Sequence, residues 1–138
     1  MEVLLAHPGG PLWARRDLGA WSIPKGEYGP EEPPLDAARR EFLEELGLPA
    51  PAGAVVDLGS VKQSSGKIVA VWAIESDLDP ALVRPGMFTM QWPPRSGRTQ
   101  EFPEVDRVAW FGLPEARDKL LRGQLPFLDR LTESLDRH

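Results

Sequence analysis

The chain has 138 residues, a formal net charge of −5, two histidines and no cysteine. This length predicts one domain, residues 1–138, with a substantial core. The absence of cysteine excludes disulfides, zinc–thiolate sites and a cysteine nucleophile, and the mildly acidic charge argues against a stable nucleic-acid complex. No segment has the length of a membrane span and no signal-peptide pattern occurs, so we expect a cytoplasmic protein without membrane contact.

The first part of the chain predicts two short strands and a loop. Residues 3–6 form an apolar run of strand length, which Pro8 and the two glycines after it end. Residues 11–16 predict a loop on the side of the substrate, and residues 21–24 predict a second short strand. Trp13 and Trp21 offer aromatic faces for stacking on a nucleobase.

A helix is predicted between two proline and glycine signals. Pro33 and Pro34 suit the first helical turn, where the missing N–H has no partner. Gly47, followed by Leu48 and Pro49, suits the left-handed position after the last turn. Between these signals one apolar face is predicted, made of Leu35, Ala38, Phe42 and Leu46.

Another face of this helix carries three neighbouring acids, Glu41, Glu44 and Glu45. Like charges at these spacings repel by about 0.2–0.5 kcal/mol per pair, and the end of a helix favours cations by roughly 0.3–1 kcal/mol. A divalent cation would reverse both effects, since Mg²⁺ takes hard oxygen ligands. The alternative interpretation is a solvated acidic face.

The second half predicts a β-rich region followed by two helices. Strands are expected at residues 54–63 and 67–75, with a hairpin turn at 64–66, and the second of them reads as buried on both faces. A helical turn at 80–82, a strand at 87–92, a basic loop at 93–98 and an acidic loop at 100–106 follow. A strand at 105–111 and helices at 113–122 and 125–135 complete the chain, with Trp72 and Trp110 expected in the core.

Residues 26–48 together resemble the signature of the Nudix hydrolases. The matching positions are Gly26, Glu32, Arg40, Glu41, Phe42, Glu44, Glu45, Gly47 and Leu48. The resemblance implies an α/β protein with a Nudix-type α/β/α sandwich around a mixed β-sheet. We expect the strand that usually precedes residues 3–6 in that family to be absent here, either because the start is shortened or because the sheet manages without it. We therefore expect an unpaired sheet edge, which favours pairing with another chain as a homodimer.

The resemblance also implies an enzyme, a Mg²⁺- or Mn²⁺-dependent pyrophosphohydrolase of a nucleoside diphosphate-linked small-molecule substrate. It assigns metal binding to Glu41, Glu44, Glu45 and the backbone carbonyl of Lys25. Arg40 is expected to pair with Glu32 or with a metal-binding glutamate, because its fork suits carboxylates. The stretch before Trp110 resembles that of dinucleoside polyphosphate and RNA pyrophosphohydrolases. It makes Glu104, with Glu101 second, a further ligand or the general base, and Glu41 and Glu45 remain alternatives for the base.

Substrate binding is assigned less uniquely. We predict contacts from Lys25, Gly26, Arg95, Arg98 and Trp92, with Lys62, Lys67 and Phe88 as further candidates. Each of these cations also suits an ordinary surface position. Dinucleoside polyphosphates and nucleoside triphosphates are the favoured substrates, and sanitation of oxidised nucleotides is the alternative reaction. A non-catalytic nucleotide sensor is the third interpretation, against which the complete set of box carboxylates argues.

Overall fold

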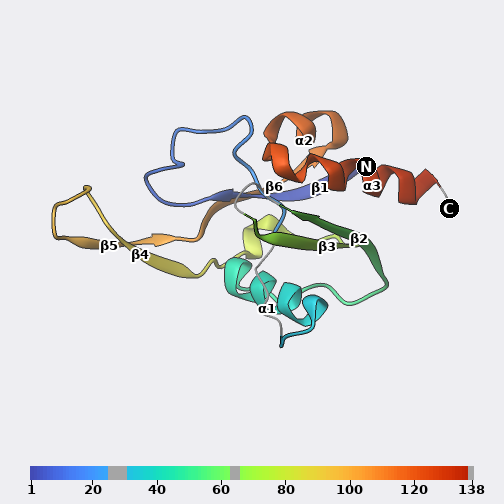
Figure 1. Ribbon diagram of the computed structural model, residues 1–138, viewed down its shortest axis with the longest axis horizontal. Coiled ribbons are helices and arrows are strands. Elements are labelled where there is room, and N and C mark those ends of the chain that lie inside the picture. Colours follow the sequence, from blue (N-terminus) through green and yellow to red (C-terminus); the bar gives the residue numbers. More distant parts are fainter. Residues whose placement is uncertain (25–30, 63–65, 137–138) are drawn as a thin grey trace.

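The computed structural model describes residues 1–24, 31–62 and 66–136. The elements, in chain order, are β1 (Glu2–Pro8), α1 (Pro34–Leu46), β2 (Val55–Lys62), β3 (Ile68–Ile74), η1 (Pro80–Leu82), β4 (Met87–Gln91), β5 (Thr99–Pro103), β6 (Val105–Gly112), α2 (Leu113–Lys119), η2 (Arg122–Gln124) and α3 (Leu125–Asp136). Within these residues the strands pair antiparallel as β1–β6, β2–β3 and β4–β5. Helices α2 and α3 lie on one side of β1, β6, β2 and β3, and α1 lies on the other (Figure 1). This layering confirms the predicted α/β class.

Strand β1 lies between the two helical layers. Successive residues of a strand point to opposite faces, and here Leu5 and Ala6 pack in different clusters. Leu5 is 1% exposed and packs with Trp21, Ala116, Leu120 and Leu128 on the side of α2 and α3. Ala6 packs with Leu46 of α1 and Val105. Because Leu5 packs toward α2 and α3 and Ala6 packs toward α1, β1 connects both helical layers of the fold. Full burial of a leucine side chain such as Leu5 contributes roughly 1.5–3 kcal/mol.

The paired strands β2 and β3 pack on α3 through Val69 and Val71, which lie against Phe127. Most of the hairpin turn predicted at 64–66 lies outside the described residues. The predicted burial of both faces of β3 is wrong at its start, because Ile68 is 50% exposed. The predicted core tryptophans Trp72 and Trp110 are half-buried. Trp110 keeps its indole N–H satisfied by donating it to the carbonyl oxygen of Leu78 at 2.9 Å.

Helix α1 follows the local signals in the sequence. It begins at Pro34, and Gly47 ends it with a left-handed φ of 71°, where its N–H donates to the Leu43 carbonyl at 2.8 Å. A side chain at Gly47 would collide with the Arg84 carbonyl oxygen, so the position also needs glycine for space. Leu46 is fully buried as expected, and Ala37 is the second fully buried residue of the helix.

Three expectations need correction. An acidic loop was predicted at residues 100–106, but residues 99–103 form strand β5, which pairs with β4. Trp21 is 3% exposed in the core, so it offers no face to a nucleobase. The helix predicted at 113–122 ends at Lys119, because Leu120 is extended and forms a parallel bridge with Trp21.

The strand predicted at 21–24 is reduced to isolated bridges at Trp21 and Ser22. Ser22 exchanges two backbone hydrogen bonds of 2.8 Å with Ala6, so it covers part of the β1 edge opposite β6. Association through that edge stays a prediction. In the part of the chain that the structure describes, no helix combines the length and the apolar character needed to cross a bilayer.

Candidate active site

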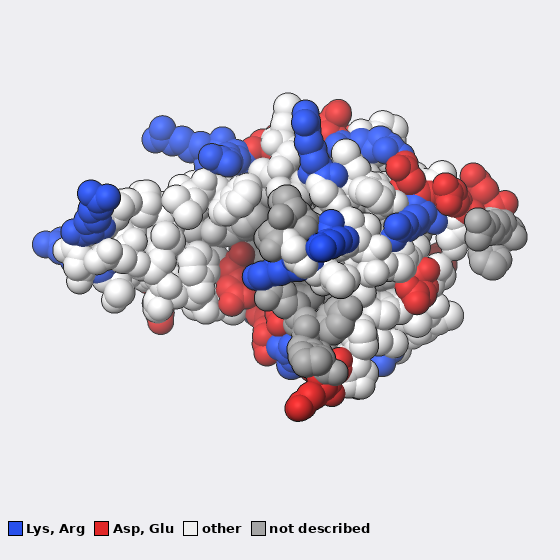
Figure 2. Space-filling view, viewed as in Figure 1, with Lys and Arg blue, Asp and Glu red and all other residues white. Residues whose placement is uncertain are grey.

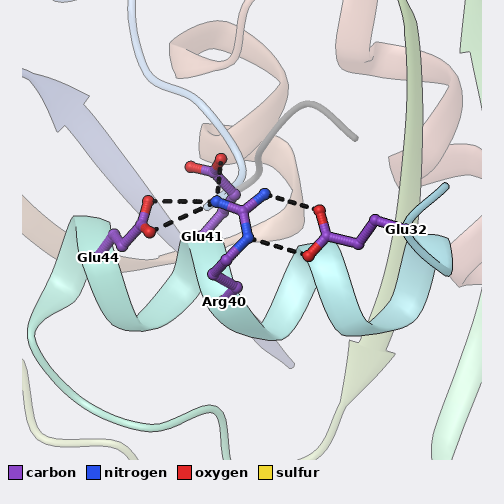
Figure 3. Close-up of polar contacts among 4 residues, drawn as sticks. All are labelled: Glu32, Arg40, Glu41 and Glu44. Carbon is purple, nitrogen blue, oxygen red and sulfur yellow. Dashed lines mark hydrogen bonds and ion pairs between the residues drawn. The ribbon is translucent and has the colours of Figure 1, made fainter. Parts of the chain in front are cut away.

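Arg40 lies at the centre of three carboxylates (Figure 3). Its Nε and Nη2 atoms donate to the two carboxylate oxygens of Glu32 at 3.0 and 2.9 Å. Its Nη1 atom donates to Glu41 at 3.0 Å and to both carboxylate oxygens of Glu44 at 3.4 Å. The expected pairing of Arg40 with Glu32 is present, and the same guanidinium also holds two of the box glutamates.

The helix explains this convergence. Glu44 lies one turn after Arg40 on the surface of α1, while Glu32 reaches Arg40 from the residues before the helix. The Arg40 guanidinium lowers the pKa of Glu32, and Glu32, followed by Glu41, raises the pKa of Arg40. These side chains are open to solvent, where ion pairs add little to stability. The cluster therefore positions its carboxylates.

Glu104 adds a further acid to this region. It is the residue between β5 and β6. Its pKa is raised, first by partial burial and then by repulsion from Glu41 and Glu44, although its side chain keeps access to solvent. Excess negative charge therefore gathers where the end of α1 meets the end of β5.

Backbone hydrogen bonds hold Glu104 beside α1. The N–H of Gly86 donates to the Glu44 carbonyl at 3.1 Å, and the N–H of Glu104 donates to the Gly86 carbonyl at 2.8 Å. The Glu104 carbonyl accepts the N–H of Gly9 at 3.0 Å, which links the site to the end of β1. A Cβ at Gly86 would lie 2.7 Å from the Glu44 carbonyl oxygen. Glycine at 86 therefore permits this close approach.

A cleft of about 410 Å³ opens beside Glu104. It is lined by Pro8, Gly9, Gly10, Leu12, Trp13, Phe88, Met90 and Glu104. Its size and largely apolar lining are typical of a small-molecule site. Trp13 and Phe88, both predicted to stack on a base, lie in this lining, and the guanidinium of Arg16 lies 5.4 Å from the Trp13 ring centre.

Sequence reasoning missed the other lining residues. In the sequence, Gly9 and Gly10 indicated only the end of a strand. In the structure, a Cβ at Gly10 would lie 2.9 Å from the Phe88 ring, so glycine allows the backbone to approach this ring closely. The paired glycines at 9 and 10 were the available signal, because glycine often marks a close backbone approach. Leu12 and Met90 carry no signal that separates them from other apolar residues.

His7 was also missed. It is fully buried at the end of β1. Its Nδ1 lies 2.7 Å from Asp106 Oδ1 and its Nε2 lies 2.6 Å from the Arg16 carbonyl oxygen. Both ring nitrogens of the buried imidazole therefore have a hydrogen-bond partner. His7 thereby joins β6 to the loop that carries Trp13.

The donor chemistry of this region suits a hard divalent cation. Glu41, Glu44 and Glu104 offer carboxylate oxygens, which Mg²⁺ prefers. The pKa of Glu104 is raised first by burial and then by Glu41 and Glu44, whose negative charge such an ion would neutralise. Among the described residues, however, no three acidic, histidine or cysteine side chains converge closely enough to hold one ion. Oxygens of Glu41 and Glu44 face Arg40 instead (Figure 3).

Only some of the other predicted site residues lie near the acidic group at α1. Glu45 lies half-buried in the last turns of α1. Lys25 and Gly26 lie outside the described residues. Trp92, Arg95 and Arg98 lie in the loop between β4 and β5, which Figure 1 shows at the far end of the hairpin from α1. A direct contact of this loop with phosphates held at α1 is therefore not supported by its placement.

Comparison with known proteins gives a family and a fold. The family model of the NUDIX domain matches residues 2–131. The solution structure of the E. coli ORF135 protein matches 99% of this chain and 84% of that chain, with a TM-score of 0.61 and 23% identity. At this identity the likeness concerns the fold, and it agrees with the α/β/α layering.

Curated relatives match a shorter segment. An RNA pyrophosphohydrolase from Pseudomonas putida is 47% identical over 47 residues, which cover 33% of this chain and 30% of that protein. The protein of the same name from Pseudomonas fluorescens matches to the same extent. The matched segment thus spans less than a third of these relatives.

Proposed function

The chain belongs to the Nudix family, and on this premise we propose that it is a pyrophosphohydrolase of a nucleoside diphosphate-linked substrate. The observation that carries the proposal is the gathering of Glu41, Glu44 and Glu104 at one end of α1, with Arg40 holding two of them. A folded protein gains nothing from this repulsion, whereas a phosphoanhydride hydrolase needs such carboxylates to hold the cations that neutralise phosphoryl oxygens.

Glu41, Glu44, Glu45, Glu104 and the carbonyl of Lys25 are the proposed ligands of Mg²⁺ or Mn²⁺. When bound, the cation would neutralise charge on the phosphates and acidify a water molecule. Hydrolysis forms one bond from the water oxygen to phosphorus and breaks one bond to the bridging oxygen, which leaves with the other phosphate. The water proton passes to a carboxylate, for which Glu104 is favoured because its raised pKa suits a proton acceptor.

Arg40 is proposed as a positioning residue. Its bidentate bond to Glu32 fixes the guanidinium, and Nη1 then sets the orientation of Glu41 and Glu44. Bidentate bonding orients a group as well as attracting it. Release of the two glutamates from Nη1 would accompany metal binding, since the same oxygens serve both.

The cleft beside Glu104 is proposed to hold the nucleobase. Trp13 and Phe88 offer aromatic faces there, and stacking on such a face contributes about 1–3 kcal/mol per base. Glu104 belongs both to the acidic group and to the lining of the cleft, so the two sites are adjacent. A nucleotide whose base lies in the cleft would therefore have its phosphates beside the acidic group at α1.

The substrate class remains a choice among nucleoside triphosphates, dinucleoside polyphosphates and oxidised nucleotides. The Pseudomonas relatives are named RNA pyrophosphohydrolases, which adds RNA as a further candidate substrate. A non-catalytic sensor is disfavoured because the box carboxylates are complete.

The test is turnover of a substrate panel in the presence of Mg²⁺, followed by product chromatography. We expect hydrolysis by the unmodified chain and a loss of roughly 100-fold or more in Glu44→Gln/Glu45→Gln. Glu133→Gln, an exposed acid on α3, is the matched control. No turnover of any nucleotide, or equal turnover by the double variant, would refute the enzyme. Retained nucleotide binding without turnover in the unmodified chain would favour the sensor.

A further inference from the structure

The β4–β5 hairpin projects from the body of the protein as an arm (Figure 1). Its strands pair with each other from Met87↔Pro103 to Gln91↔Thr99. The base is packed, since the rings of Phe88 and Phe102 lie 6.0 Å apart and Phe88 also lies beside Gly10. The arm is therefore anchored at its base, and its loop at residues 92–98 lies at the free end.

This loop presents two unpartnered cations. Arg95 and Arg98 are exposed, and among the described residues neither side chain has a hydrogen-bond or ion-pair acceptor. Two backbone hydrogen bonds within the loop hold its conformation. The Trp92 N–H donates to the Arg98 carbonyl at 3.0 Å, and the Ser96 N–H donates to the Pro93 carbonyl at 3.1 Å. A pre-ordered loop that holds free guanidinium groups in solvent is suited to an anionic ligand.

Several arginines in the body of the protein have partners, although Arg122 resembles the tip arginines in having no acceptor among the described residues. Arg84 and Arg130 donate to carbonyl oxygens, and Arg117 pairs with Asp129. Figure 2 shows positive groups at the end of the hairpin and on the neighbouring loop between β1 and α1, whereas acidic groups lie between the base of the hairpin and α1. The charge thus changes sign along the arm.

Three features follow one another along the hairpin. Glu104 lies at its base, the cleft formed in part by Phe88 and Met90 lies beside β4, and the cations lie at the tip. Arg98 and Glu104 flank β5, and the six steps along the chain from one to the other span about 20 Å at about 3.4 Å each. Phosphates placed at α1 are therefore too far away to contact the tip.

The substrate classes differ in where they carry phosphate. In a nucleoside triphosphate, all phosphates lie on one side of the nucleoside. In a dinucleoside polyphosphate they lie between the two nucleosides, so a base in the cleft leaves only a second nucleoside beyond the phosphates. A polynucleotide alone continues from its first nucleoside into further phosphates, spaced by about 3.4 Å or more along a strand. About 20 Å accommodates several nucleotides.

We propose that the tip of the β4–β5 hairpin binds the phosphodiester backbone of a single-stranded RNA whose 5′-triphosphate lies at α1. This inference rests on the proposed function and selects its substrate class. The reaction adds water across the anhydride between the α and β phosphates. The water oxygen joins one phosphorus and the bridging oxygen stays with the other, which yields a 5′-monophosphate RNA and pyrophosphate. The net charge of −5 disfavours a stable nucleic-acid complex, so the tip binds RNA as a substrate, through a few local phosphate contacts that salt weakens.

The experiment compares two substrates on the full-length chain with Mg²⁺: GTP and a 5′-triphosphorylated RNA octamer that begins with G. The test variant is Arg95→Gln/Arg98→Gln, and Arg95→Lys/Arg98→Lys retains the charge. Arg122→Gln is the matched control, because Arg122 is exposed in η2 and has no acceptor among the described residues. We expect the glutamine double variant to lower kcat/KM about 10-fold for the octamer and to leave GTP hydrolysis unchanged.

The salt dependence supplies a second readout. Each phosphate contact to a single strand contributes about 0.7 to the slope of log K against log salt, so loss of two contacts should lower the slope by about 1.4. The lysine variant and the Arg122 control should keep the original slope. Anisotropy of a 3′-labelled octamer measures this slope without turnover, so the arm is tested even if catalysis fails.

The outcomes separate the two proposals. Hydrolysis of GTP with none of the octamer, or an equal fall for both substrates in the glutamine variant, would overturn the role of the arm and leave the pyrophosphohydrolase intact. Absence of all turnover, with a charge-dependent octamer affinity at the tip, would refute the enzyme and support the binding site. Octamer affinity unchanged by the glutamine variant overturns the inference in every case.

Discussion

The acidic cluster on α1 and the basic tip of the β4–β5 hairpin differ in whether their charged side chains are paired with one another. At α1, one guanidinium contacts the carboxylates of Glu32, Glu41 and Glu44. At the tip, Arg95 and Arg98 have no acceptor among the described residues. In the first region the Arg40 guanidinium orients acidic side chains, whereas in the second region the guanidinium groups are open to a binding partner.

This difference separates positioning from binding. Charges that satisfy each other inside a protein define geometry, and their removal disturbs neighbouring groups. Charges that face solvent alone define what the surface attracts, and their removal leaves the fold unchanged. The two regions should therefore respond differently to neutralisation, and the variants below test that difference.

The largest effect is expected from Arg40→Met. This change releases Glu41 and Glu44 from Nη1 and leaves Glu32 without its bidentate partner, so the acids lose their common orientation. Loss of a group that orients metal-binding side chains typically costs 10–100-fold in affinity or activity. We expect a fall of this size in kcat and a higher Mg²⁺ concentration at half-maximal rate. Arg39→Met, on an exposed neighbouring position, is the control; equal rates for both variants would show that Arg40 orients nothing.

His7→Leu should have the next largest effect, on stability. The change removes both ring nitrogens and leaves Asp106 and the Arg16 carbonyl without these hydrogen-bond partners. Leaving such groups unsatisfied costs about 1–3 kcal/mol, which urea unfolding followed by tryptophan fluorescence would measure. The loop that holds Trp13 should loosen, so KM for nucleotides should rise as well. An unchanged free energy of unfolding would show that the contacts of His7 with Asp106 and the Arg16 carbonyl do not stabilise the fold.

Glu104→Gln should give a smaller effect that depends on pH. The pKa of Glu104 is raised in the folded protein, so the folded state holds its proton while the unfolded chain ionises above the ordinary value of 4.5. Ionisation of this group therefore lowers stability as pH rises through that region. Without metal, the variant should melt at a higher temperature than the unmodified protein at pH 7, and the difference should vanish below pH 4.

Added Mg²⁺ should reverse this order at pH 7, because an ionised Glu104 gains a cation to bind. Thermal melts of both proteins at several pH values, with Mg²⁺ and with a chelator, measure the pH-dependent difference in melting temperature and its reversal by the metal. An identical pH dependence of the two proteins would show that neither burial nor the charges of Glu41 and Glu44 raise the pKa of Glu104.

Local signals made some parts of this structure predictable. The prolines before α1 and Gly47 after it bound the helix in sequence, and the spacing of Glu41, Glu44 and Arg40 follows from one turn of α1. Strand β5 was missed because its partner β4 contributes the pairing while its own first residues are exposed and polar. The cleft and the bridge from His7 to Asp106 join residues about a hundred positions apart, and no local pattern encodes such contacts.

The smallest expected effect is on the stability of the tip variant. Arg95→Gln/Arg98→Gln removes two cations without partners among the described residues, so the free energy of unfolding should stay within about 0.5 kcal/mol of the unmodified value. Arg130→Gln is the matched contrast, since Arg130 donates to the carbonyls of Leu58 and Ser60 and should lose about 1 kcal/mol. Urea unfolding of both variants measures the difference. If the tip variant were as destabilised as Arg130→Gln, its arginines would serve the fold. A reduced RNA affinity could then no longer be read as loss of phosphate contacts.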